Sequence, residues 1–465
     1  MKTLPALLLA VCAFPVLAEN WPAWRGPRGD GTSTERNVPT KWSGTENVVW
    51  KTPLAIGHAS PIVWGDRLFI VEAVADSEGR NLLCFDKHSG KLLWSQTVVK
   101  SPLEKKHREN SHASSTPATD GKLVYVAFLD VQDMVVAAYD FSGKQQWLAR
   151  PGVFKSVHGF CTSPILHNGK VIVNGDHDGD SYIAALDQAT GKTLWKVPRA
   201  NKTRSYCAPL IRTLSGRTQM LVAGDKSTAS YDPDTGKRLW RTWTVPAPGE
   251  KGSETWPNAT KPDAWKYGGG ATWQYANYDP QLDLIYLGTG NAEPYNPSYR
   301  EGADSLYTAS VIALRPKTGE MVWHYQYVPN DSYDYDATAE SILADITVEG
   351  KPRKVLINPH KNGFLYVLDR TNGQLIAANP YVKVTWATHI DMKTGRPVLT
   401  DILQKAMAGE QVTFWPARGT NATLAAFNPK TGLVYLNAWH KARIMKFVEA
   451  KLNLGSGYTG VETTF

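Results

Sequence analysis

The chain has 465 residues, of which 42% are hydrophobic and 20% are charged. This composition excludes a disordered chain, and the length excludes a mini-protein that needs disulfide bonds to fold. The net charge is +8, but the sequence has no run of basic residues, which argues against nucleic-acid binding. The mild positive charge points instead to anionic small ligands or an acidic partner.

The first 18 residues resemble a secretory signal peptide. Lys2 gives a positive start, residues 4–16 are mostly apolar, and Ala18 is a small residue before the expected cleavage at Glu19. The apolar run is too short to span a bilayer, and no later segment reaches about 18 apolar residues. The alternative is an N-terminal membrane anchor. We therefore expect an exported, periplasmic protein that does not span the membrane.

Cysteines give little constraint on the rest of the chain. Three remain after residue 18, which is too few for a disulfide framework. The sequence has no Cys-x-x-Cys-His motif, so we expect no c-type haem attached to this chain.

A repeated motif organises the chain from about residue 80 onward. Alternating apolar residues end in Asp, Asn or Arg, a Thr-Gly, Ser-Gly or Asn-Gly turn follows, and most copies then have Trp. The copies begin at Cys84, Ala138, Ala185, Ser230, Ala313, Val367 and Ala426. The early Trp residues recur at roughly 50-residue intervals, and a period of this length is typical of repeat architectures.

A second marker runs in phase with the first. A small residue followed by Pro, as in Ser163-Pro164, precedes each of several strand-like segments such as 171–174. Gly supplies the positive φ that the hairpin turn needs. These units predict an all-β fold, a single β-propeller of seven or eight four-stranded blades. The alternative is a string of separate β-sandwiches, which the absence of linkers disfavours.

The Ala-x-Asp-x-x-Thr-Gly-x-x-x-Trp unit resembles the tryptophan-docking repeat of quinoprotein propellers. That family includes enzymes that hold pyrroloquinoline quinone (PQQ) and non-catalytic relatives such as outer-membrane assembly lipoproteins. Residues 19–245 resemble exported PQQ-like repeat proteins without established chemistry. Residues 246–465 are similar to PQQ-dependent alcohol dehydrogenases. We expect the two halves to complete one quinoprotein dehydrogenase-like ring, after a signal peptide at 1–18.

The resemblance implies a cofactor site in the second half. Trp273, at the end of a Gly-Gly-Gly-Ala-Thr-Trp stretch, matches the plate under the quinone. Asn291, after Gly-Thr-Gly, matches a metal ligand, and an amide oxygen suits a hard cation. Lys361 matches the basic residue that contacts the quinone oxygens in catalysis, and Asn421 lies where the family contacts the cofactor.

The same resemblance places the catalytic base at Asp334, in Ser-Tyr-Asp-Tyr-Asp. A carboxylate beside a metal can take the alcohol proton while the quinone accepts hydride. In this family an acidic residue two positions later, here Asp336, accompanies lanthanide use, because an added anionic oxygen favours a trivalent ion. The implied cofactors are therefore PQQ and a calcium or lanthanide ion.

Each of these residues also has a purely structural interpretation. Trp273 could pack between blades like the repeat tryptophans, and Asn291 could be an ordinary turn residue. Asp334 and Asp336 could belong to a solvated acidic loop, and Lys361 to a surface hairpin. The Asp-His-Asp-Gly-Asp stretch at 176–180 is better explained as a turn than as a calcium-binding loop. His158 is better explained as a contact between blades than as a metal ligand.

The sequence also departs from the dehydrogenase pattern. Only Asp225 stands near the place of the family's metal-binding Glu, and Ala422 replaces a Trp beside the cofactor. No two cysteines are adjacent, so the family's vicinal disulfide is absent. The chain ends at Phe465, where a further blade is expected to begin.

Two functional hypotheses follow. The first is a periplasmic, PQQ- and metal-dependent dehydrogenase that oxidises a primary alcohol or aldehyde and passes electrons to an external cytochrome c. The alternative is a non-catalytic propeller that binds a protein or polysaccharide partner. The series Asn291, Asp334 and Lys361 favours the enzyme, whereas the missing Glu and the early end of the chain favour the alternative.

Overall fold

The structure is a computed structural model that describes residues 18–36, 38–200, 202, 204–224, 226–273, 276–421, 423–452 and 458–464. Residues 1–17 of the expected signal peptide lie outside this range, as do Asp225 and Ala422. Within the described part of the chain, no helix is both long enough and apolar enough to cross a membrane.

Six sheets of four antiparallel strands follow one another along the chain, and in each the strands pair in sequence order. Their strands are β1 (Ile62–Trp64), β2 (Arg67–Val74), β3 (Gly79–Asp86), β4 (Leu92–Lys100), β5 (Ala118–Thr119), β6 (Leu123–Asp130), β7 (Asp133–Asp140), β8 (Gln145–Val153), β9 (Ile165–His167), β10 (Lys170–Gly175), β11 (Tyr182–Asp187), β12 (Thr193–Pro198), β13 (Leu210–Leu214), β14 (Arg217–Gly224), β15 (Ser227–Tyr231), β16 (Arg238–Trp243), β17 (Ala276–Asp279), β18 (Leu284–Gly288), β19 (Ser310–Leu314), β20 (Met321–Gln326), β21 (Ile342–Val348), β22 (Lys351–Pro359), β23 (Phe364–Asp369) and β24 (Leu375–Pro380).

The last part of the chain forms smaller sheets. Two-stranded sheets pair β25 with β26 and β28 with β29, and a three-stranded sheet has the order β27-β30-β31. These elements are β25 (Ala387–Ile390), β26 (Pro397–Leu399), α2 (Ile402–Met407), β27 (Val412–Phe414), β28 (Ala426–Asn428), β29 (Leu433–Tyr435), β30 (Arg443–Phe447) and β31 (Val461–Thr464); a second short helix, α1 (Ala264–Tyr267), precedes β17.

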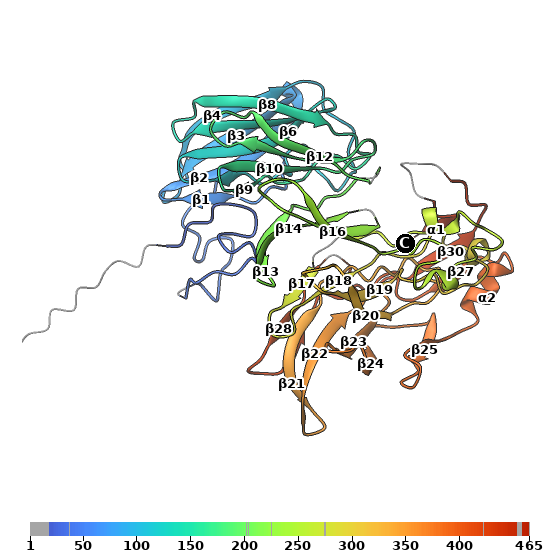
Figure 1. The fold of residues 1–465 in the computed structure, drawn as a ribbon. Coiled ribbons are helices and arrows are strands. Elements are labelled where there is room, and N and C mark those ends of the chain that lie inside the picture. Colours follow the sequence, from blue (N-terminus) through green and yellow to red (C-terminus); the bar gives the residue numbers. More distant parts are fainter. Residues whose placement is uncertain are drawn as a thin grey trace, which may run out of the picture.

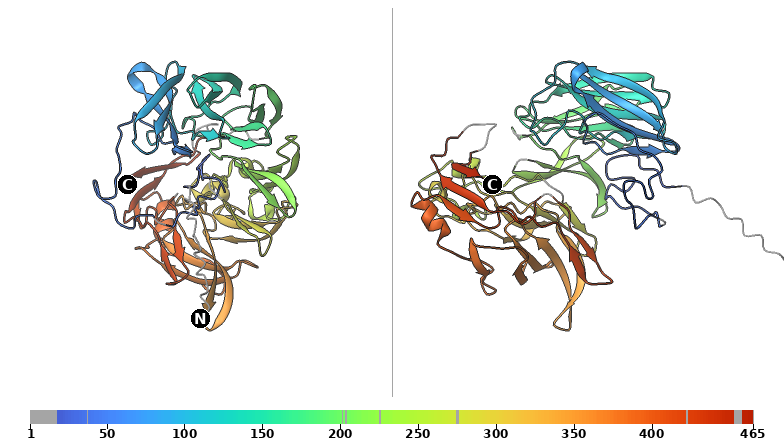
Figure 2. Two further views of the ribbon diagram at one scale, coloured as in Figure 1. Left: turned by 90° about the vertical axis from the view of Figure 1, so that its left-hand side faces the viewer. Right: turned by 180° about the vertical axis from the view of Figure 1, so that it is seen from behind.

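The sheets are arranged as the blades of a propeller. In the left view of Figure 2 they follow one another around a ring, from blue through green to orange. The predicted propeller of four-stranded blades is therefore confirmed. The described residues form six such blades, and the smaller sheets stand where a seventh and an eighth were expected. The reason is local, because the segment after β24 has short strands, an inserted helix and no Trp in its last repeat copy.

Tryptophan plates join neighbouring blades. The indole of Trp147 in β8 packs on Gly191 of the next blade, and its Nε1 donates to Gln188 O at 3.1 Å. At that turn Gly191 has φ +73°, and an added Cβ would lie 2.6 Å from the indole, so only Gly fits. Equivalent contacts pair Trp94 with Gly143, Trp195 with Gly236, Trp240 with Gly319 and Trp323 with Gly373.

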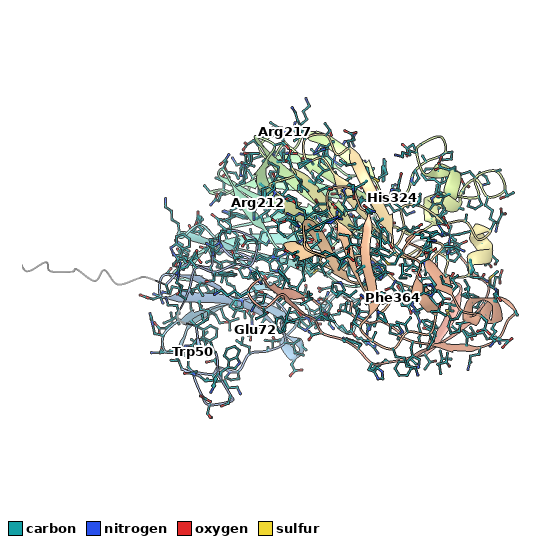
Figure 3. All side chains as sticks on the ribbon, turned by 90° about the horizontal axis from the view of Figure 1, so that it is seen from below. Trp50, Glu72, Arg212, Arg217, His324 and Phe364 are labelled. Carbon is teal, nitrogen blue, oxygen red and sulfur yellow. The ribbon has the colours of Figure 1, made fainter. Side chains whose placement is uncertain are left out.

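Trp50 makes the same contact one unit earlier. It packs on Gly90 of the first blade and donates from Nε1 to Lys87 O at 2.9 Å (Trp50 is labelled in Figure 3). Between blades the core is apolar, as where Val124 and Val126 of β6 pack with Phe69 of β2.

The two ends of the ring differ. Figure 1 shows α1, α2, β27 and β30 at one end, and the blue segment that precedes β1 at the opposite end. Each blade has a loop before its first strand and another loop after its second strand. Neighbouring blades can therefore bring residues of such loops together.

Candidate active site

Four of the predicted site residues meet between the fifth and sixth blades. Asn291 follows β18, Lys361 follows β22, and Asp334 and Asp336 lie in the loop before β21. Lys361 Nζ lies 3.0 Å from Asp334 Oδ1 and 2.8 Å from Asp336 Oδ2. The backbone N–H of Asn291 donates to Asp336 Oδ1 at 3.0 Å. The propeller repeat thus gathers residues that are up to 70 positions apart into one cluster.

The cluster is largely buried and highly charged. Asp336 and Lys361 are 7% and 6% exposed, whereas the Asp334 side chain is 26% exposed. Burial raises the pKa of Asp334, although Lys361 and Arg443 act in the opposite direction. Burial alone would lower the pKa of Lys361, but Asp336 and Asp334 outweigh it and the pKa is raised. The two carboxylates therefore favour the charged form of Lys361, and Asp334 is the more accessible of the two.

This burial contradicts two of the structural interpretations. Asp336 does not lie in a solvated acidic loop, and Lys361 is not on a surface hairpin. Two other structural interpretations agree with the observed contacts. Asp178 pairs with Arg204 at 2.9 Å, as expected of a turn, and His158 Nδ1 lies 2.6 Å from Tyr206 Oη of the next blade.

Sequence reasoning missed two charged residues at this cluster. Arg443 in β30 donates from Nη1 to Tyr333 O at 3.0 Å and lies 3.4 Å from Asp334 Oδ2. Glu293 is close enough to Asp334 and Asp336 for their charges to raise its pKa. Its position two residues after Asn291 was a usable signal. No sequence signal pointed to Arg443, because it lies in a strand 109 residues after Asp334.

Glu293 makes the stability of the metal-free protein depend on pH. Burial, followed by Asp334 and Asp336, raises its pKa from 4.5 to about 7. The folded state binds this proton more tightly than the unfolded chain, so the stabilisation is lost as pH rises through about 7. We expect Glu293 to contribute roughly 2 kcal/mol to the fall in the free energy of unfolding, measured with guanidinium in EDTA, between about pH 5 and about pH 8.

The variant Glu293→Gln should flatten this dependence. Part of it should remain, because burial also raises the pKa of Asp331 to about 7. Identical pH dependence in the wild type and the variant would contradict the assignment to Glu293.

Trp273 and Asn421 lie differently from the cluster. Trp273 is on the wall of an axial cavity of about 640 Å³, which residues 22–27 and Gly29 also line. None of the four clustered residues lines that cavity. Asn421 lies two residues after Gly419, whose N–H donates to Lys361 O at 2.7 Å. The structure therefore brings Asn421 toward the cluster by its backbone and leaves Trp273 at the cavity.

The oxygen donors at the cluster suit a hard cation. Asn291 Nδ2 donates to Ala292 O at 2.9 Å, which fixes the amide, and the carboxylates of Glu293, Asp334 and Asp336 are the type of ligand that calcium and trivalent ions take. Among the described residues, no group of three His, Cys, Asp or Glu side chains is close enough to hold a metal. The types of donor atom therefore fit a hard metal ion. In this structure, however, Asp334 and Asp336 contact the Lys361 ammonium group.

Two family models match the chain. Residues 211–385 match the one described as glucose/ethanol/alcohol dehydrogenase, beta-propeller domain. Residues 40–150 and 84–256 match the one described as outer membrane protein assembly factor BamB. The chain is thus similar to propellers of PQQ-type repeats, and the resemblance of its second half to quinoprotein alcohol dehydrogenases is confirmed.

Individual relatives agree with this class. The chain is 40% identical over 330 residues to quinohemoprotein alcohol dehydrogenase ADH IIB of Pseudomonas putida, a match that covers 65% of this chain and 46% of the relative. It is 36% identical to the lanthanide-dependent methanol dehydrogenase of Methylacidiphilum fumariolicum (strain SolV), over 63% of this chain and 51% of the relative. The chain therefore spans about half the length of these curated relatives.

Solved structures are similar as well. A europium-containing methanol dehydrogenase has a TM-score of 0.54 and 27% identity, over 88% of this chain and 66% of that chain. Quinohemoprotein alcohol dehydrogenase ADHIIG of Pseudomonas putida HK5 has a TM-score of 0.56 and 27% identity, over 90% of this chain and 56% of that chain.

Proposed function

We propose that the protein is a PQQ- and metal-dependent dehydrogenase that oxidises a primary alcohol or aldehyde. One observation carries the proposal, namely the contact of Lys361 with both Asp334 and Asp336 beside Asn291. This cluster unites a general base, a cation and oxygen donors for a metal. The names of the similar proteins, which are alcohol and methanol dehydrogenases, support the same reaction class.

The chain's own residues would divide the chemistry between them. Asp334, the more exposed carboxylate, takes the hydroxyl proton of the alcohol as general base. Lys361 keeps that carboxylate anionic and in place by charge-assisted hydrogen bonding. PQQ, when bound, supplies the two-electron acceptor. Lys361 and Asn421 would provide its polar contacts, whereas Trp273, the expected aromatic plate, lines a cavity that none of the four clustered residues lines.

A metal would draw its ligands from Asn291, Asp334, Asp336 and Glu293, whose three carboxylates would have to come closer together than they are in this structure. A calcium or lanthanide ion is the expected occupant, because all four supply hard oxygen donors. Asp336 adds an anionic oxygen that favours the trivalent ion, and one relative is lanthanide-dependent by name.

We place the protein in the periplasm, with a separate cytochrome c as electron acceptor. The signal-like residues 1–18 support export. The absence of a Cys-x-x-Cys-His motif in this sequence supports an external haem carrier.

Reconstitution tests the proposed function. The full chain after residue 18 is titrated with PQQ in the presence of calcium, lanthanum or EDTA, while tryptophan fluorescence and alcohol-dependent dye reduction are followed. We expect quenching and turnover with a metal and neither in EDTA. No quenching and no dye reduction with either metal would refute the dehydrogenase and leave the non-catalytic alternative.

A further inference from the structure

Arg300 connects the two loops of the cluster although it touches none of the four predicted residues. It ends a short 3-10 helix, η3 (Pro297–Arg300), in the loop that follows Asn291, and it is 0% exposed. One guanidinium nitrogen donates to Pro294 O of the same loop. The other donates to Asp331 O at 2.8 Å and to Asn330 Oδ1 at 2.9 Å in the loop of Asp334.

Asp331 continues this connection to the catalytic carboxylate. It is 1% exposed, and its two carboxylate oxygens accept the backbone N–H groups of Tyr333 at 3.0 Å and Tyr335 at 2.7 Å. These bonds bracket Asp334, whose φ is +69°. A left-handed φ is less favourable for Asp than for Gly, and these flanking bonds help to hold it. In that conformation Asp334 Oδ1 meets Lys361.

Stability alone does not explain why Arg300 and Asp331 are charged. Burying a charged side chain costs free energy, which an apolar residue of similar volume would avoid. The planar guanidinium does, however, fix several acceptors in one geometry, which a single apolar side chain cannot do. Arg300 uses this geometry to hold carbonyl oxygens from two different loops.

We propose that Arg300 and Asp331 are positioning residues that fix the loop of Asn291 against the loop of Asp334. Arg300 sets the separation of the two loops, and Asp331 sets the backbone turn that presents Asp334 to Lys361. The expected effect on turnover rests on the proposed function, whereas the geometric effect does not.

Turnover of reconstituted variants tests the proposal. Arg300→Met and Asp331→Asn should lower kcat by about 100-fold with KM changed by less than about threefold, because a misplaced group loses rate rather than binding. Terbium luminescence sensitised by the protein should weaken in both, and Arg300→Lys, which keeps part of the donor set, should restore part of both signals. The matched control is Arg199→Met, which removes another fully buried Arg, between the third and fourth blades.

The outcomes separate positioning from general destabilisation. Wild-type kcat in Arg300→Met and Asp331→Asn, or an equal loss of kcat in Arg199→Met, would overturn the proposal. If Arg300→Met does not fold, Arg300→Lys and Asp331→Asn decide by the same criterion.

If the wild type shows no turnover, that result counts against the proposed function alone. A crystal structure of the variant then tests the positioning role without any activity. Asp331→Asn should then show Asp334 out of the left-handed region and away from Lys361. An unchanged Asp334 would overturn the positioning role.

Discussion

Replacing Asp334 by Asn should lower alcohol-dependent dye reduction by roughly a thousandfold, within the range that a general base contributes. The amide has the same shape and can still accept a hydrogen bond from Lys361, which lies 3.0 Å from Oδ1 in the wild type. It cannot take the proton of the alcohol. The measurement is kcat of the protein reconstituted with PQQ and metal, with far-UV circular dichroism to show that the blades are intact.

A matched control is Asp369→Asn. Asp369 is 8% exposed, pairs with Arg353 at 3.6 Å and accepts the backbone N–H of Thr371 at 2.9 Å, but it is the last residue of β23 and lies away from the cluster. This variant should keep turnover within about threefold of the wild type, since most substitutions away from the reacting groups act on stability. Turnover within tenfold of the wild type in Asp334→Asn would show that another group is the base.

Replacing Arg199 by Met should lower the free energy of unfolding by about 3–5 kcal/mol, the usual cost of leaving one member of a buried ion pair. Arg199 and Asp176 have fully buried side chains and form two bonds, at 2.7 and 2.8 Å. Arg199 also donates to Tyr231 Oη at 3.1 Å, across to the next blade. Guanidinium unfolding at neutral pH measures the loss, provided that the transition is two-state.

The double variant Asp176→Leu, Arg199→Met should recover most of that loss, because no unpaired charge then remains buried. A surface control is Asp263→Asn, which breaks the exposed pair with Lys266 and should change the free energy of unfolding by less than about 0.5 kcal/mol. A loss below about 1 kcal/mol in Arg199→Met would show that the pair is not a structural element of the ring.

The fold could be predicted because its determinants are local. Each Gly turn and each Trp lie within one unit, and the Gly that a Trp contacts follows about one period later, so the sequence displays the packing directly. Trp50 escaped because no turn motif accompanies it, and only its contact with Gly90 reveals its role. Among the small sheets, only the β28–β29 hairpin was marked in advance, by the repeat copy at Ala426; the others escaped because their strands are too short to show a periodic pattern.

The site could be predicted only in part, for a related reason. The family resemblance pointed to Asn291, Asp334, Asp336 and Lys361 as site residues, and the structure brings these four together. The contacts that shape the cluster are long-range, as between Arg443 and Asp334, and no spacing within a motif encodes them. Burial was equally inaccessible, since an Asp-x-Asp loop has the same sequence whether it faces water or, as here, the interior.

The tryptophan plates also impose an order on assembly. Each plate needs a glycine turn that the chain supplies only about one blade later, so a blade leaving the ribosome presents an uncovered indole until its successor has formed. In the first blade the Gly90 turn is already covered by Trp50, which precedes it, although the blade's own plate, Trp94, still needs Gly143 of the second blade. That blade can therefore serve as a template on which the next ones add in sequence, as in other repeat architectures where each unit stabilises its neighbour. Contacts between adjacent units keep the average sequence separation short, which favours fast folding for so large a β structure.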